Sequence, residues 1–207
     1  MKIGGPRFFQ RSVLLAAACM LALVLTACTG KGGGYLPPGA SAGTGVLFTG
    51  QAPFGFTFSC EDKGGLNPPT GQLAIELAYS DQGTSLLLTA PFSIHGIVDE
   101  IDPVLESQIC QGQEPPPGGN ELIFLGRYRP TSSSKPGGLK SCPTRETTTS
   151  PLCRFEVIVQ DNDNNLRPSK GDFFSIKLSS ATKVTSELTD VFYARAGLLA
   201  GGNITVK

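Results

Sequence analysis

The sequence predicts an all-β protein, an antiparallel β-sandwich or barrel of about eight to ten short strands. Apolar and β-branched residues fall into short runs that alternate with a period of two, which is typical of strands that bury one face. Clusters of glycine and proline separate these runs. The chain has 26 glycines and 16 prolines, and only 16% of its residues are charged, a composition that favours strands and turns over surface helices.

The first expected strand covers residues 53–60, where Phe54, Phe56 and Phe58 alternate with small residues. This spacing places the three rings on one sheet face. We expect that face to be core rather than a sugar-binding platform, because the chain has no tryptophan. Further strands are expected at residues 72–79, 92–98, 121–128, 154–159, 172–178, 191–196 and 203–206. Residues 104–109 are the one weak candidate for a helix.

Residues 1–27 read as a signal peptide. Lys2, Arg7 and Arg11 precede an uncharged, largely aliphatic stretch from residue 12 to residue 25, which is short for a full membrane span of roughly 20 residues. The following Leu25-Thr-Ala-Cys28 resembles the bacterial lipobox, and this resemblance implies that Cys28 carries a lipid. The alternatives are an ordinary cleaved secretory peptide and an uncleaved helical anchor.

The expected location is therefore the bacterial cell envelope, with the protein lipid-anchored to a membrane and facing outside the cytoplasm. Thr29, rather than aspartate, follows the lipid site and favours the outer membrane in a host that has one. Residues 28–45 are rich in glycine and proline and predict a flexible tether. The β domain is expected over residues 46–207. Beyond the leader, acidic side chains outnumber basic ones, which argues against nucleic acid as a partner.

Four cysteines follow Cys28, namely Cys60, Cys110, Cys142 and Cys153. An even number in an exported protein predicts two disulfides, with three pairings open. We favour Cys142–Cys153, which flanks a polar loop, together with Cys60–Cys110. The cysteine spacing does not suggest a zinc site, and the chain has a single histidine.

The loop at residues 161–172 is the best candidate for a metal site. Asp161, Asp163 and Asn165 alternate, and Asp172 takes the twelfth position. Such a loop supplies the oxygen ligands that calcium requires. Leu166 replaces the turn glycine of an EF-hand and Asp172 replaces its bidentate glutamate, so a solvated turn is the alternative. We expect no other cofactor.

Catalysis finds little support in the sequence. His95 suits a general base at neutral pH, and Ser93, Asp99 and Glu100 lie near it in the chain. Ser93 and His95 on one strand are poorly placed for proton transfer, however, and the chain lacks a nucleophile elbow. The acidic cluster of Asp99, Glu100, Asp102 and Glu106 is better explained as a solvated edge than as a glycosidase pair.

A series of short motifs follows one another in the chain: Gly55-Phe-Thr-Phe58, Pro69-Thr-Gly-Gln-Leu73, Tyr79-Ser-Asp-Gln-Gly83, Ile94-His-Gly96, Arg154-Phe-Glu-Val-Ile-Val-Gln-Asp-Asn162, Lys170-Gly-Asp-Phe-Phe-Ser-Ile176 and Gly201-Gly-Asn-Ile-Thr-Val206. In this order they resemble the post-COAP domain family of exported bacterial proteins. The chain departs from the family pattern at Asp163, where the family usually has glycine, in an insert over residues 98–119 and in an extra cysteine-bearing loop. The resemblance implies a β-rich exported domain and names no activity.

Together these observations favour a non-catalytic structural or binding domain, with an envelope protein or a glycan as its partner. A calcium-stabilised adhesion or carbohydrate-binding module is the alternative. A hydrolase is the third and weakest hypothesis.

Overall fold

The computed structural model describes residues 28–40, 47–62, 71–83, 91–97, 119–133, 137–147, 149–162, 171–182 and 188–207. The expected signal peptide, the weak helix at residues 104–109 and the acidic cluster at residues 99–106 lie outside these ranges. So do Asp163, Asn165 and Cys110.

The described chain is all-β, as the sequence predicts. Nine strands form one antiparallel sheet in the order β10-β9-β8-β7-β6-β5-β4-β1-β11, and β2 and β3 form a separate two-stranded ribbon. A short 3₁₀ helix, η1 (Gly137–Ser141), follows β7. The strands are β1 (Cys28–Leu36), β2 (Gly39–Ala40), β3 (Leu47–Phe48), β4 (Ala52–Asp62), β5 (Gly71–Asp81), β6 (Phe92–Ile97), β7 (Glu121–Pro130), β8 (Cys153–Gln160), β9 (Phe173–Ser179), β10 (Val191–Leu198) and β11 (Gly201–Val206).

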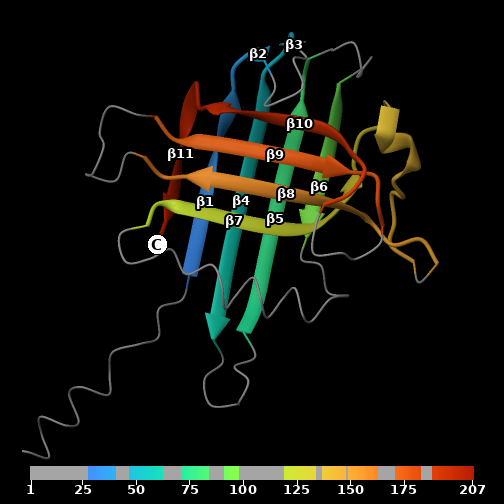
Figure 1. Ribbon diagram of the computed structural model, residues 1–207, viewed down its shortest axis with the longest axis horizontal. Coiled ribbons are helices and arrows are strands. Elements are labelled where there is room, and N and C mark those ends of the chain that lie inside the picture. The colour runs from blue at the N-terminus through green and yellow to red at the C-terminus, as the bar shows by residue number, and fades with distance from the viewer. Residues whose placement is uncertain are drawn as a thin grey trace, which may run out of the picture.

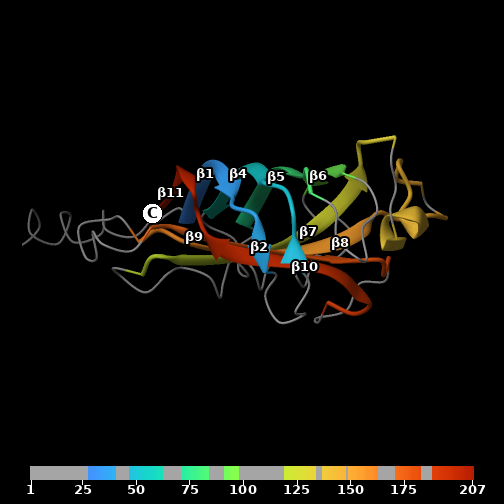
Figure 2. The same ribbon diagram turned by 90° about the horizontal axis from the view of Figure 1, so that it is seen from above.

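The sheet folds over on itself into two layers. Strands β1, β4, β5 and β6 run side by side in one layer, and β8, β9 and β10 cross over them in the other (Figures 1 and 2). Strand β7 makes the corner, since it pairs with β6 only through residues 127–130 but with β8 through residues 121–128. Gly126 permits the corner, because a Cβ atom there would lie 2.5 Å from the Ile97 carbonyl oxygen and 2.6 Å from the Phe155 ring.

The opposite corner brings the two ends of the sheet together. The edge strands β10 and β11 follow each other in the chain. The turn between them is held by two backbone hydrogen bonds, from Leu199 N–H to the Asp172 carbonyl (2.9 Å) and from Ala200 N–H to the Tyr35 carbonyl (3.1 Å). Gly202 has a φ of +110° and packs directly against β1, which only glycine tolerates here. The sheet is thus curled almost into a barrel.

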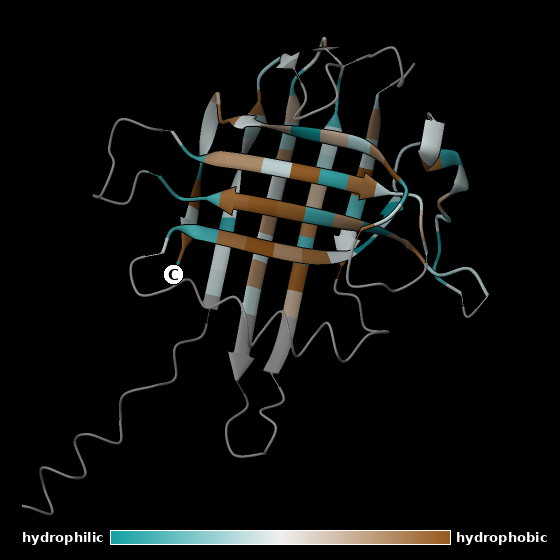
Figure 3. Ribbon diagram, viewed as in Figure 1, coloured by the Kyte–Doolittle hydropathy of each residue, from teal (hydrophilic) through white to brown (hydrophobic). Residues whose placement is uncertain are grey.

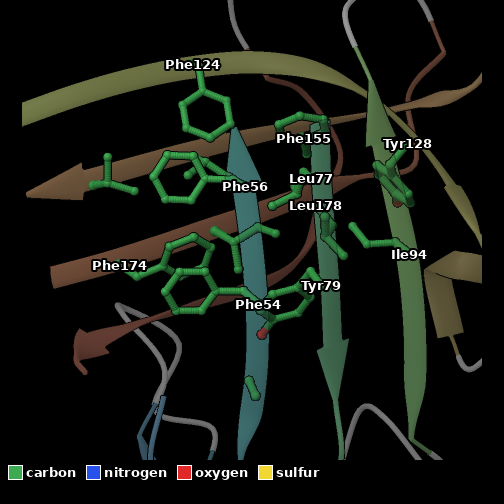
Figure 4. Close-up of a cluster of buried hydrophobic side chains, with 14 of the residues drawn as sticks. Phe54, Phe56, Leu77, Tyr79, Ile94, Phe124, Tyr128, Phe155, Phe174 and Leu178 are labelled. Carbon is green, nitrogen blue, oxygen red and sulfur yellow. The ribbon is translucent and has the colours of Figure 1, made fainter. Parts of the chain in front are cut away.

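The core lies between the two layers, and aromatic rings make up much of it (Figure 4). The strands that enclose it carry many hydrophobic residues (Figure 3). Phe54, Phe56 and Phe58 of β4 all point inward, which confirms that this face is core. Phe54 stacks on Phe174 of β9 with 3.7 Å between ring centroids, and Phe56 packs on Phe124 of β7 at 5.4 Å. The alternation seen in the sequence therefore joins opposite layers through ring contacts.

The sequence placed a flexible tether over residues 28–45, and for residues 28–36 this expectation is wrong. Cys28–Leu36 form β1, an interior strand that pairs with β11 on one side and with β4 on the other. The strand is stabilised mainly by its backbone ladders, and only Leu36 at its end is part of the buried hydrophobic core. For this reason its glycine-rich sequence resembles a linker. The described β domain therefore includes residues 28–36, which the sequence assigned to the tether.

All eight strands expected from the apolar alternation are present, as β4 to β11. The favoured disulfide Cys142–Cys153 is also confirmed, with 5.5 Å between the two Cα atoms. It closes the loop before β8, and Glu146 in that loop forms an ion pair with the buried Arg127 of β7. Cys60 lies in β4, and its expected partner Cys110 falls outside the described residues, so the second pairing stays a prediction.

Candidate functional site

A buried polar cluster joins the end of β5 to the middle of β10, beside the β2–β3 ribbon. Arg195 Nη1 donates to Asp81 Oδ2 at 2.8 Å, and the two side chains are 2% and 0% exposed. The Tyr193 hydroxyl donates to the same carboxylate oxygen at 2.6 Å, and the Gly83 N–H donates to Asp81 Oδ1 at 2.8 Å. Because the Tyr193 proton is committed to Asp81, the Tyr79 hydroxyl donates to Tyr193.

Arg195 also holds the segments around the small ribbon in place. Its Nη2 donates to the carbonyl oxygens of Pro37 (2.7 Å) and Gly50 (2.6 Å), one on each side of the β2–β3 ribbon. Its guanidinium lies 4.9 Å from the centroid of the Phe48 ring. One arginine thus connects β10, β5 and the ribbon, and most of its hydrogen-bonding capacity is used within the protein.

The cluster shifts the pKa values of its members. Burial alone would lower the pKa of Arg195, but its hydrogen bond to Asp81 and the charge of that carboxylate raise it overall. Burial raises the pKa of Tyr79 and Tyr193 well above the ordinary range, and the Asp81 carboxylate raises both further. Burial likewise raises the pKa of Tyr128, at the edge of the disulfide loop. The cluster is therefore an ion pair surrounded by neutral phenols.

These tyrosines predict that the protein loses stability in alkali. Below pH 10 the three phenols are neutral whether the chain is folded or not. Above pH 10 the unfolded chain releases protons that the folded state retains, so the free energy of unfolding falls as pH rises, by up to ~4 kcal/mol per pH unit for three groups. Urea titrations between pH 9 and pH 12 measure the slope. We expect Tyr128→Phe to remove about a third of it.

A second buried polar cluster binds the edge of β11 that does not pair with β1. Thr29 and Lys207 exchange two backbone hydrogen bonds of 2.9 Å across β1 and β11. The alternate N–H groups of β11 therefore point away from β1. Asp172 Oδ2 accepts the Ile204 N–H at 2.7 Å, and Asp161 Oδ2 accepts the Val206 N–H at 3.2 Å.

The same two aspartates are the described members of the expected calcium loop. Asp172 Oδ1 accepts the Asn162 N–H at 2.9 Å, so both of its carboxylate oxygens are occupied by backbone donors. Asp161 and Asp172 are 6% and 3% exposed. No group of three or more histidine, cysteine or acidic side chains suited to a metal occurs within the described residues. These carboxylates close the edge of the sheet at β11 by accepting its backbone N–H groups. Calcium ligation by the loop stays a prediction.

His95 lies on the outer face of β6. Its charged neighbour is Glu76 of β5, which was not predicted from the sequence. Its Nε2 is 3.3 Å from Glu76 Oε2 of β5, and Glu76 is two-thirds exposed. The Ser93 hydroxyl instead donates to Ser80 Oγ at 3.0 Å, and Ser80 in turn donates to the Phe92 carbonyl at 3.1 Å. The fold therefore engages Ser93 and His95 with separate neighbours rather than with each other.

These polar side chains border a groove of about 380 Å³ on the outer face of β4, β5 and β6. Pro53, Ser80, Ser93, His95 and Thr131 contribute to its walls. Hydroxyl groups and an imidazole lie there beside a mostly apolar lining that includes Phe54, Tyr79 and Ile94, which suits contact with a ligand or a partner surface of mixed polarity. A nucleophile paired with a base is not among the contacts that the structure describes here.

No family model matches the chain, and neither the curated proteins nor the solved structures contain a significant match. Within the described residues, no helix is long and apolar enough to cross a membrane.

The Asp81–Arg195 cluster was not predicted from the sequence, although a signal was present. Tyr193 and Arg195 alternate in β10, and they are the two buried residues of that strand. Asp81 belongs to the Tyr79–Gly83 motif, whose roles are now explicit: the tyrosine and aspartate enter the cluster and the glycine N–H caps the carboxylate. A charged residue at an inward position of a strand requires a buried partner. Applied to Arg195, this rule predicts a buried acidic side chain beside it, and Asp81 is that side chain.

Proposed function

We propose that this chain is an exported bacterial lipoprotein, with a lipid on Cys28 and a non-catalytic β domain that serves a structural or binding role in the cell envelope. The observation that carries the proposal is the Leu25-Thr-Ala-Cys28 sequence directly after an uncharged apolar stretch. The resemblance to the post-COAP family of exported domains supports the same location.

The contacts of the candidate residues support a non-catalytic role. Asp161 and Asp172 accept backbone N–H groups, and the Asp81–Arg195 pair is enclosed in the core. These side chains hold the fold together and are not presented to a substrate. The groove beside His95 is the concave surface on which we place a binding role, with an envelope protein or a glycan as its partner. No separate observation favours the hydrolase or the calcium-dependent module.

The lipid is tested by replacing Cys28. The full chain with its own leader is produced in a bacterial host and fractionated, beside Cys28→Ser and beside Thr29→Ser as a matched neighbouring control. We expect the parent and Thr29→Ser proteins in the membrane fraction, with an intact mass that includes acyl chains, and Cys28→Ser without that mass. An unmodified Cys28 in the parent protein would contradict the proposal.

A further inference from the structure

We infer that the lipidated protein stands on the membrane in one orientation, with the Cys28 end of the sheet against the headgroups and the Arg195 end facing away. The lipid itself rests on the proposed function, and the orientation rests on β1. A tethered domain would tumble above the bilayer, whereas a domain anchored through an interior strand cannot.

Almost no flexible chain separates the lipid site at Cys28 from the folded sheet. The residue after Cys28 is already held, because Thr29 N–H donates to the Lys207 carbonyl and Lys207 N–H donates to the Thr29 carbonyl, both at 2.9 Å. Cys28 itself pairs in register with Cys60 of β4. The acyl chains therefore begin at the folded sheet and are not separated from it by a linker.

Strand β1 is also difficult to release. It pairs with β11 from Gly30 to Tyr35 and with β4 along its whole length, so peeling it away breaks two ladders at once. Gly30 lies tightly against the Leu122 side chain, and Gly32 against Phe56 and Ile204. Detachment would expose this part of the core to water, which is unfavourable.

The strand directions then define what faces the bilayer. Cys28, Asp62, Gly71 and Lys207 lie at one end of the β1, β4, β5 and β11 ladder. Leu36, Ala52 and Asp81 mark the other end, about 27 Å away at the usual rise of a strand. In Figure 1 these strands run side by side between the two ends. The groove at Pro53, Ser80 and Thr131 lies toward the far end, open to partners in the envelope.

Tryptophan fluorescence provides the test, since the chain has no tryptophan of its own. Single variants Lys207→Trp and Gln82→Trp place an indole at exposed positions near and far from Cys28. The full chain is lipidated in its host, checked by intact mass, and reconstituted into phosphatidylcholine vesicles with and without a headgroup-nitroxide lipid. We expect the nitroxide to quench Lys207→Trp several-fold more than Gln82→Trp, and to quench neither when Cys28→Ser is added.

The other outcomes separate the inference from the proposed function. Equal quenching at both positions in protein of lipidated mass would overturn the orientation and leave the lipoprotein intact. An intact mass without acyl chains would overturn both. Peptide mapping that found Cys28 joined to Cys60 by a disulfide would do the same, because the two residues face each other in register and a thiol bound in this way cannot carry the lipid.

Discussion

Replacing Asp81 with asparagine is expected to lower the free energy of unfolding by about 3–5 kcal/mol. The change removes the negative charge from a site that is 0% exposed and leaves the Arg195 guanidinium buried without its counter-charge. An amide also has only one acceptor oxygen. The carboxylate accepts hydrogen bonds from Arg195 and Tyr193 with one oxygen and from the Gly83 N–H with the other, and an asparagine side chain cannot accept all three in this way.

Glu76→Gln is the matched control, since it also replaces a carboxylate of β5 with an amide, but at a side chain that is two-thirds exposed. We expect a loss of about 1 kcal/mol or less there. Chemical denaturation of both variants at pH 7 gives the comparison. The double variant Asp81→Asn/Arg195→Met should be less destabilised than the sum of its single variants, because it removes the buried cation as well. Equal effects of Asp81→Asn and Glu76→Gln would show that the cluster is not the structural centre we describe.

Replacing Asp172 with asparagine is expected to cost about 2–3 kcal/mol of stability. The carboxylate accepts the Asn162 N–H with one oxygen and the Ile204 N–H with the other, and asparagine can accept only one of the two. The remaining backbone donor is left buried without an acceptor, a larger penalty than the loss of an exposed hydrogen bond. The strand β11 should loosen first, since it contributes the Ile204 donor.

The control for this variant is Asp190→Asn, an exposed aspartate whose φ of +54° asparagine tolerates equally well. Thermal unfolding in millimolar calcium and in excess chelator is compared for the parent protein and Asp172→Asn. Because the carboxylate is occupied by backbone donors, we expect the same Tm for each protein in both conditions. A Tm that rises by several degrees with calcium in the parent and not in Asp172→Asn would establish the metal loop instead.

The strands with inward apolar residues could be predicted from the sequence, and the reason is local. Phe54, Phe56 and Phe58 alternate within one strand, so a single window of sequence carries the signal for β4. Strand β1 has no such signal, because four of its nine residues are glycine and its stability comes from neighbours on both sides. Composition alone could not separate a glycine-rich linker from a glycine-rich strand between two ladders.

The candidate sites were harder to predict because their parts are far apart in the chain. Asp81 and Arg195 are separated by 114 positions, and Asp161 reaches a backbone N–H 45 positions away. The alternation of Asp161, Asp163 and Asn165 suggested a metal loop, whereas the described aspartate of this series serves β11. Short sequence motifs indicated which residues matter, and only the folded chain shows what each one contacts.

Amide hydrogen exchange over residues 29–36 of the mature protein tests the central structural claim most directly. This segment is an interior strand of a curled sheet, so its amides should exchange as slowly as those of β4. The Ile204 and Val206 amides of β11, which donate to Asp172 and Asp161, should be protected as well. Exchange of residues 29–36 at the rate of an unstructured peptide would contradict the account. In that case the segment is a tether, and the fixed orientation on the membrane falls with it.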